Sequence, residues 1–303
     1  MDETLIRVDH ITKDYGGGRG VFDLNFEVRR GEIFGFVGTN GSGKTTTIRQ
    51  MMGFLKPTSG HITVLGRDAW AETTAIKQFT SYVPGEIAFP DLPTGTAFLK
   101  VQAEFLGVTD MTYANRLIRD LQLDPSANLK RMSKGMKQKT AIVAALMGDR
   151  DILILDEPTT GLDPLMREVF ISAVLEEKSK GKTVFMSSHI YQEIEDTCDR
   201  VALIRDGRIV DIADMNEIRH HNVKTFRLGF RDRAEYDDFR TKYSRIETEY
   251  PDKLHLTVDC DDRDVNALFA LLSGYSLAFL SEIKYTLEKH FADILEGASE
   301  NEQ

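Results

Sequence analysis

Up to about residue 219, short uninterrupted apolar runs alternate with stretches of helical periodicity. Typical runs are Ile33–Val37, Ile152–Leu155 and Thr183–Met186. They do not alternate with polar residues, and each leads towards a helical stretch, as is typical of parallel strands buried on both faces. The pattern therefore predicts an α/β fold with a parallel sheet at its centre.

Two parts of this first region differ from that pattern. Leu5–Val8 and Phe22–Val28 alternate between apolar and polar positions and are joined by the glycine-rich segment 16–20, which predicts an antiparallel β subdomain. Between about residues 86 and 148 the apolar positions recur at helical spacing, so we expect a helical subdomain inserted into the α/β core. The helical spacing is found in Phe98–Leu106, Tyr113–Leu121 and Met136–Met147.

The character of the chain changes near residue 220, and a second, smaller domain is predicted over residues 223–303. Its pattern follows the order strand, helix, strand, strand, helix, strand, and then a last helix with Thr286 as the expected N-cap. This order is that of a ferredoxin-like α+β domain. The expected strands are Val223–Phe230, Arg245–Tyr250, Leu254–Val258 and Ser276–Tyr285; the first helix carries Tyr236, Phe239 and Tyr243, and the second is Val265–Leu272.

The composition is that of a globular protein with enough apolar residues for two cores. The chain has 303 residues, 41% of them hydrophobic, and 38 Lys and Arg against 48 Asp and Glu give a net charge of −10. This acidic excess argues against a protein that wraps nucleic acid, since phosphate binding needs basic patches. We therefore expect two domains, 1–219 and 223–303, and no nucleic-acid partner.

No segment predicts a membrane span or a secretory signal. The longest nearly uninterrupted apolar run, Ala141–Met147, is far shorter than the roughly 20 residues of a membrane-spanning helix. The first residues lack the basic and apolar regions of a signal peptide. Cys198 and Cys260 have no metal-ligand spacing and are expected to be small buried residues.

The segment Gly38–Thr45 matches the pattern GxxxxGK[ST] between an apolar strand and a helical stretch. Glycines let backbone amides point inward, the following helix offers free N–H groups, and Lys44 adds a positive charge. The loop is predicted to hold polyphosphate, with the Thr45 hydroxyl on a Mg²⁺ ion that bridges the terminal phosphates. The predicted nucleotide-binding residues here are Gly38, Thr39, Asn40, Gly41, Ser42, Gly43, Lys44, Thr45 and Thr46.

Two carboxylates follow the buried strand Ile152–Leu155. Asp156 and Glu157 are expected beside the phosphate loop, because ligands in such folds bind at the carboxyl ends of the strands. Asp156 can hold the Mg²⁺ water shell, and Glu157 can act as a base that polarises water. The alternative is that the pair only begins the next loop.

With these two motifs in place, the chain resembles the ATP-binding subunit of an ABC transporter over roughly residues 3–217. The family's signature segment, usually LSGGQ, appears as Met132–Met136, with only Ser133 and Gly135 kept. The resemblance implies a P-loop ATPase cassette in which Ser133, Gly135 and Met136 contact the nucleotide held by an opposing subunit. The alternative for Ser133 is a plain helix N-cap.

Three further positions match the family by their order along the chain. Asp163 belongs to the segment that matches the D-loop, His189 matches the switch histidine, and Tyr15 matches the aromatic residue that stacks on adenine. The resemblance implies that His189 hydrogen-bonds the γ-phosphate and acts with Lys44 and Glu157 in hydrolysis. Without the resemblance, a lone histidine after a strand is most simply structural.

One position departs from the family's pattern. Where the family usually has a glutamine after a strand, this chain has Gly85 followed by Glu86. Gly85 has no side chain to reach Mg²⁺ or water. Either Glu86 replaces the glutamine, which adds it to Thr45 and Asp156 as a metal-site residue, or that contact is absent.

The resemblance implies an ATPase that uses ATP and Mg²⁺, dimerises around two nucleotides and powers a separate membrane protein. The expected partners are an integral membrane permease and a second ATP-binding subunit, either another copy or a related chain, at the cytoplasmic face of the membrane. The segment Thr286–Phe291 looks like part of the domain appended to subunits of ABC-2 type exporters, so we expect export rather than import.

The competing hypothesis is a soluble ABC ATPase that acts on ribosomes or DNA. Ribosome-acting members usually carry two cassettes, and DNA-acting members have long coiled-coil insertions. This sequence has one cassette and no such insertion. A third hypothesis, in which the C-terminal domain binds a small regulatory ligand, is supported by no motif in residues 223–303.

Overall fold

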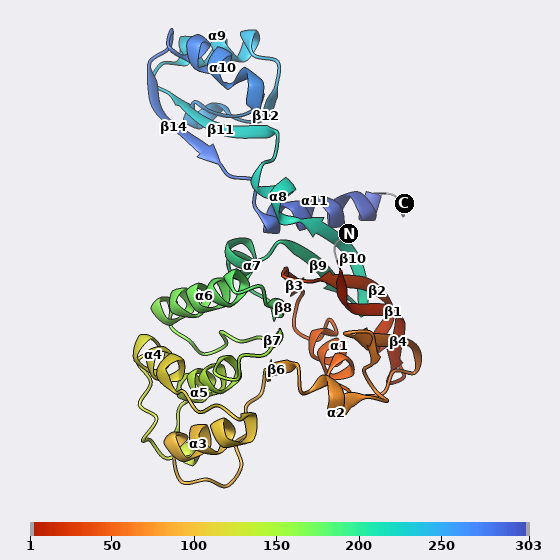
Figure 1. The fold of residues 1–303 in the computed structure, drawn as a ribbon. Coiled ribbons are helices and arrows are strands. Elements are labelled where there is room, and N and C mark those ends of the chain that lie inside the picture. The colour runs from red at the N-terminus through yellow and green to blue at the C-terminus, as the bar shows by residue number, and fades with distance from the viewer. Residues whose placement is uncertain (1–2, 301–303) are drawn as a thin grey trace. The chain divides into compact units, whose positions relative to one another are not determined.

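The computed structural model describes the backbone of residues 3–300, so the extreme ends of both predicted domains, 1–2 and 301–303, lie outside the described residues (Figure 1). The chain divides into two compact units between Met215 and Asn216. Helix α8, Met215–Arg219, therefore falls almost wholly in the second unit, whereas the composition placed the end of the first domain at residue 219. Among the described residues, no helix is both long and apolar enough to cross a lipid bilayer.

A six-stranded sheet with the order β10-β9-β3-β8-β7-β6 forms the centre of the first unit. Its neighbouring strands are parallel, except that β10 pairs antiparallel with β9. Every residue of β3, β7 and β8 is buried, as the continuous apolar runs require, and the predicted parallel sheet is confirmed. The strands are β3 (Ile33–Val37), β6 (Thr80–Val83), β7 (Ile152–Asp156), β8 (Thr183–Ser188), β9 (Arg200–Arg205) and β10 (Arg208–Asp214).

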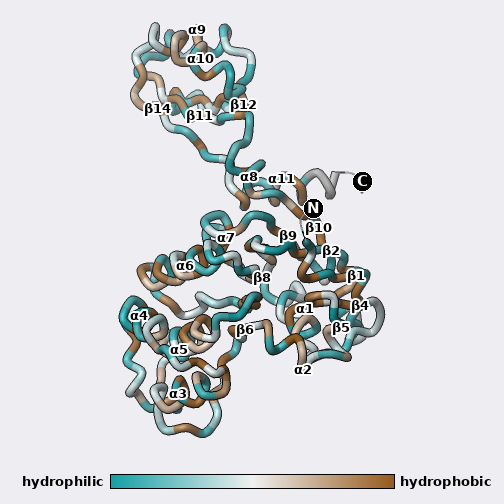
Figure 2. Tube along the Cα trace, in the orientation of Figure 1, coloured by the Kyte–Doolittle hydropathy of each residue, from teal (hydrophilic) through white to brown (hydrophobic). Residues whose placement is uncertain are grey.

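The antiparallel β subdomain is a second sheet, with the order β2-β1-β4-β5. One apolar core joins it to the central sheet, because Phe26 stacks on Phe34 with ring centroids 5.4 Å apart and also contacts Phe185. Figure 2 shows hydrophobic residues along β1 and β2. The elements are β1 (Thr4–Asp14), β2 (Gly20–Arg29), β4 (Ser59–Val64) and β5 (Arg67–Asp68), with helices α1 (Lys44–Met51), α2 (Thr73–Ile76), α6 (Pro164–Ser179) and α7 (Tyr191–Thr197) in the same unit.

The helical subdomain follows β6 and returns to the sheet at β7. Its first helix begins at the N-cap Thr94, whose hydroxyl accepts a hydrogen bond from the Ala97 amide, and ends at the left-handed Gly107. Its last helix begins after Ser133. The helices are α3 (Gly95–Leu106), α4 (Thr112–Asp120) and α5 (Lys134–Leu146), with a short 3₁₀ helix at Leu129–Arg131. All three lie where the helical spacing predicts them.

The second unit has the predicted order of elements, and its sheet order is β12-β13-β11-β14 with antiparallel neighbours. This arrangement is the ferredoxin-like fold. Thr286 caps the last helix, because its hydroxyl accepts a hydrogen bond from the Lys289 amide. Cys198 and Cys260 form no disulfide, and both are buried. The elements are β11 (Val223–Phe230), α9 (Arg233–Lys242), β12 (Ile246–Tyr250), a 3₁₀ turn at Pro251–Lys253, β13 (His255–Asp261), a 3₁₀ turn at Asp262–Asp264, α10 (Val265–Leu272), β14 (Leu277–Ile283) and α11 (Leu287–Glu300).

Candidate functional site

The phosphate loop connects the buried strand β3 to helix α1. Gly41 and Gly43 have φ angles of +84° and +115°, which residues with a Cβ rarely adopt, so the loop depends on glycine at these positions. A Cβ on Gly43 would also lie 2.5 Å from Val21 Cγ1. Lys44 is 6% exposed, and its Nζ donates hydrogen bonds to the Gly38 and Thr39 carbonyls at 2.6 and 3.2 Å. The loop thus folds around the lysine ammonium.

Glu157 lies between the other two predicted catalytic residues. Its Oε1 is 3.1 Å from Lys44 Nζ, and its Oε2 is 2.5 Å from His189 Nδ1. Glu157 has a φ angle of +49°, a strained conformation for a residue with a side chain, and its amide donates to the backbone and side-chain oxygens of Ser187. The end of β8 therefore holds the turn that directs this carboxylate towards the phosphate loop.

Asp156 is fully buried at the end of β7, and one of its oxygens has a partner. Ser187 donates a hydrogen bond to Oδ1 at 2.8 Å, whereas Oδ2 has no hydrogen-bond partner. Burial raises the pKa of Asp156, and the nearby hydroxyls of Ser187 and Thr45 only partly oppose this effect. A buried carboxylate oxygen without a partner, beside the Thr45 hydroxyl, fits a hard cation such as Mg²⁺.

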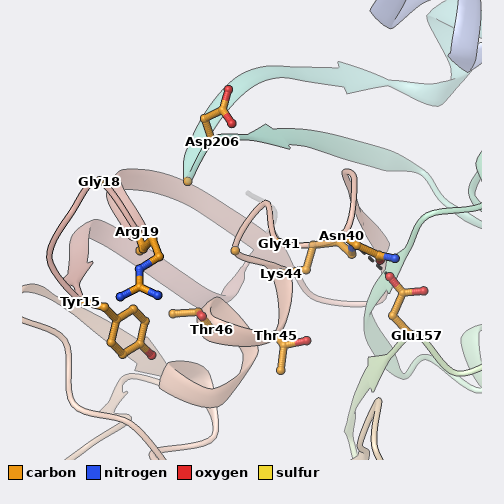
Figure 3. Close-up of a pocket in the computed structure, with 13 residues that line it drawn as sticks. Tyr15, Gly18, Arg19, Asn40, Gly41, Lys44, Thr45, Thr46, Glu157 and Asp206 are labelled. Carbon is orange, nitrogen blue, oxygen red and sulfur yellow. Dashed lines mark ion pairs between the residues drawn. The ribbon is translucent and has the colours of Figure 1, made fainter.

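A cavity of about 520 Å³ lies over the phosphate loop. Tyr15 and Arg19 lie at one end of this view and Glu157 at the other, with Lys44 and Thr45 between them (Figure 3). The cavity is large enough for a nucleotide, since ligand sites of small molecules measure about 300–1,000 Å³. It is lined by Tyr15, Gly18, Arg19, Gly20, Asn40, Gly41, Gly43, Lys44, Thr45, Thr46, Glu157, Asp206 and Gly207.

Two charged residues of this lining were missed by the sequence analysis. Arg19 lies in the glycine-rich segment close after Tyr15, and this proximity was a signal that could have been used. Asp206 lies in the turn between β9 and β10. No motif marks Asp206, because only the packing of that turn beside β2 brings it to the cavity; the Phe22 amide donates to the Gly207 carbonyl at 2.7 Å.

The predicted signature and D-loop residues do not line this cavity in the described part of the chain. The Ser133 hydroxyl accepts a hydrogen bond from the Met136 amide and caps α5, and Asp163 caps α6 in the same way. The two segments contact each other, because a Cβ on Gly135 would lie 2.7 Å from the Gly161 carbonyl oxygen. Their predicted contact with nucleotide would involve an opposing subunit.

Glu86 does not line the cavity over the phosphate loop. It lines a second cavity, together with Gly85 and residues of α5. A Cβ on Gly85 would lie 3.3 Å from Asp156 Oδ2. The backbone at Gly85 thus lies beside the predicted metal site, whereas Glu86 lines the cavity beside α5.

Comparison with known proteins agrees with this geometry. Residues 21–160 match the family model of the ABC transporter domain. The chain is 34% identical to the bacitracin transport ATP-binding protein BcrA of Bacillus licheniformis, over 76% of this chain and 77% of that protein. It is also 34% identical to the linearmycin resistance ATP-binding protein LnrL of Bacillus subtilis, over 71% and 70% of the two chains.

Structural similarity leads to the same family. A solved ATP-binding subunit of an ABC transporter superposes with a TM-score of 0.64 and 31% identity, covering 71% of this chain and 92% of that one. The range 21–160 that matches the family model includes the phosphate loop, Asp156 at the end of β7 and the following Glu157. The protein belongs to the ATP-binding subunits of ABC transporters and is an ATPase that powers transport through a membrane partner.

Proposed function

We propose that the cavity over the phosphate loop binds ATP with its triphosphate along the loop and its adenine against Tyr15. Tyr15 is about half exposed, so its ring offers a flat apolar face to a base. Lys44 would hold the terminal phosphates, and the loop amides and the start of α1 would add further donors. Arg19, which sequence analysis did not assign, would contribute a second cation at the Tyr15 end.

Thr45 and Asp156 are the residues proposed to hold Mg²⁺. The ion would neutralise charge on the phosphate oxygens. The partnerless Oδ2 of buried Asp156 supports this assignment. Glu86 was predicted as a third member of the metal site; its place in the cavity beside α5 favours the alternative in which this contact is absent.

Glu157 is proposed as the base that polarises the attacking water, with His189 holding its carboxylate. The observation that carries this assignment is the contact of both Lys44 and His189 with the two Glu157 oxygens. When phosphate enters the loop, Lys44 can exchange its contact with Glu157 for phosphate oxygens. Glu157 would then be free to accept a proton from water.

Two such subunits are proposed to dimerise around two nucleotides, with Ser133, Gly135, Met136 and Asp163 facing the partner's site. An isologous dimer has two equivalent sites by symmetry. We further propose that the membrane partner is an export permease. Two relatives support this: one is a bacitracin transport ATP-binding protein, and the other is a linearmycin resistance ATP-binding protein. The chain would then lie at the cytoplasmic face, with the second unit as an accessory domain.

The Glu157→Gln variant tests this proposal, because the amide keeps the shape of the side chain and loses the base. We expect hydrolysis to fall at least about a hundredfold, while a dimer persists in chromatography with Mg-ATP. The exposed Glu104→Gln on α3 serves as the matched control and should hydrolyse ATP at the normal rate. Normal turnover in Glu157→Gln would contradict the role of Glu157, and loss of turnover without any dimer would contradict the dimer.

A further inference from the structure

The loop that carries His189 is fixed on both sides of the histidine by one side chain. Ser188, the last residue of β8, is 1% exposed, and its hydroxyl accepts a hydrogen bond from the Ile190 amide at 3.0 Å. The same hydroxyl donates to Glu193 Oε2 at 2.9 Å. The two chain neighbours of His189 are therefore joined to each other and to Glu193.

Glu193 is a buried carboxylate in the first turn of α7. It is 2% exposed and lies three residues after the N-cap Ile190. In a capping box, an acidic residue at this position accepts a hydrogen bond directly from the N-cap amide. Here the Ser188 hydroxyl lies between the two groups, accepting from one and donating to the other. The start of α7 and the histidine loop thus share one chain of hydrogen bonds.

Arg167 is the cation that faces Glu193 from α6, a helix that packs beside α7 (Figure 1). Its Nε lies 3.9 Å from Glu193 Oε1, and neither atom has a hydrogen-bond partner in the described chain. A buried carboxylate needs such an opposite charge, because it is otherwise poorly tolerated. One oxygen of Glu193 is therefore directed towards Ser188 and the other towards Arg167.

The His189 ring depends on its loop for its position. Its side chain is 46% exposed, so packing against neighbours restricts the ring little. Its contact with Glu157 nevertheless requires a short distance, 2.5 Å from Nδ1 to Oε2. A displacement of the loop by about 1 Å would break this contact, and displacements of that size in an active site can slow a reaction by about a hundredfold.

We propose that Glu193 is a positioning residue for ATP hydrolysis, which holds the His189 loop where the imidazole reaches Glu157. The proposal rests on the roles proposed above for Glu157 and His189. Within the described residues, Glu193 does not line the nucleotide cavity. Its effect on hydrolysis would therefore come through the histidine loop and leave nucleotide binding nearly unchanged.

The first test compares the steady-state ATPase kinetics of the full-length wild type and Glu193→Ala. We expect kcat to fall at least about tenfold, with KM for ATP within about twofold, because the loop is released and the phosphate loop is untouched. Ser188→Ala removes the same hydrogen bond and should give the same result. Asp196→Ala removes an exposed carboxylate from the same helix and should keep the wild-type kcat.

The conservative variant separates positioning from a general loss of structure. Glu193→Gln keeps an oxygen that can accept from Ser188, so we expect its kcat to be within about threefold of the wild type. It also loses the charge opposite Arg167, so its melting temperature should still be lower than that of the wild type. A kcat that falls as far in Glu193→Gln as in Glu193→Ala would contradict positioning through Ser188.

A double-mutant cycle with His189→Ala tests whether Glu193 acts through the histidine. Single-turnover measurements with enzyme in excess resolve the slow residual hydrolysis. We expect the double variant to hydrolyse ATP as fast as His189→Ala alone, although Glu193→Ala lowers the melting temperature in both backgrounds. A further fall in rate in the double variant would show that Glu193 supports the site by another route.

Two more outcomes distinguish this proposal from the catalytic assignments on which it rests. Normal kcat in folded Glu193→Ala, with slow hydrolysis in His189→Ala, would overturn the positioning role alone. Normal hydrolysis in His189→Ala would contradict the proposed role of the histidine, and the positioning role with it. Circular dichroism of each variant checks that it is folded.

Discussion

Lys44 carries a nearly buried positive charge, and its surroundings explain why phosphate binding depends so strongly on this one residue. Its ammonium is held by two loop carbonyls and by Glu157, so it is already oriented before any ligand enters. Such orientation lowers the entropy cost of binding, because no flexible side chain has to be ordered. The charge and the loop geometry therefore act together on the phosphates.

Lys44→Ala is expected to weaken Mg-ATP binding at least about tenfold and to abolish useful turnover, since a full charge is lost beside several phosphate oxygens. A titration with fluorescent nucleotide measures the affinity. Lys56→Ala, at an exposed lysine just beyond α1, is the control for loss of one positive charge. Equal affinities for the wild type and Lys44→Ala would show that the loop does not bind triphosphate.

At the scale of elements, a polar cluster joins α4 of the helical subdomain to α6 beside the central sheet. The Tyr113 hydroxyl donates to Glu177 Oε1 at 2.6 Å, and Arg116 contacts Glu176. Glu177 is fully buried and also contacts Lys180 and Lys182. Removing one member leaves buried polar groups unsatisfied, so this cluster fixes the subdomain against the core.

Tyr113→Phe is expected to lower the free energy of unfolding by about 1 kcal/mol, because one buried hydrogen bond to a carboxylate is lost. Urea denaturation followed by circular dichroism measures the change. Tyr250→Phe removes a hydroxyl from a partly exposed ring in the second unit and should leave the unfolding of the first unit unaltered. An unchanged denaturation midpoint in Tyr113→Phe would mean that the cluster does not hold the two elements together.

The same cluster predicts a dependence of stability on pH. Burial tends to raise the pKa of Glu177, but hydrogen bonds from Lys180, Lys182 and Tyr113 outweigh it and lower the pKa below the usual 4.5. A lowered folded-state pKa contributes stability above the ordinary pKa, and this contribution is lost as the pH falls through the folded value. The advantage of the wild type over Glu177→Gln should therefore shrink below about pH 4.5.

At the scale of the whole molecule, the nucleotide cavity belongs entirely to the first unit. Every residue of its lining precedes Met215, and the apolar core that supports the phosphate loop lies in the same unit. The second unit has its own core, formed by Phe226, Leu228, Phe230, Tyr236, Phe239, Leu256, Val258, Cys260, Leu268 and Leu272. Separate cores are the physical basis for separate folding.

A chain ending at Met215 is therefore expected to fold and to bind Mg-ATP within about threefold of the full-length affinity, since no contact to the cavity is removed. Thermal unfolding and nucleotide titration measure both properties. A matched chain ending at Arg219 keeps α8 and tests the choice of boundary. A folded short chain without Mg-ATP binding would show that the second unit supports the nucleotide site.

Local patterns determined most of the fold and the first half of the site. Continuous apolar runs identify β3, β7 and β8, because buried parallel strands expose neither face. Helical spacing of apolar residues identifies α3 to α5, because side chains three and four residues apart lie on the same face of a helix. The phosphate loop can be recognised because its glycines, Lys44 and Thr45 are contiguous in the chain. Wherever neighbours in sequence are neighbours in space, the sequence alone was sufficient.

Contacts between distant segments were decided only by the tertiary structure. The meeting of His189 with Glu157, the place of Asp206 in the cavity and the unpartnered Oδ2 of Asp156 depend on how strands and loops pack. The sequence also left Glu86 open between two roles, because the direction of its side chain depends on how the segment after β6 passes α5. Periodicity specifies which face of an element is buried, but it carries no distance between two elements. That distance is set by the packing of side chains throughout the core.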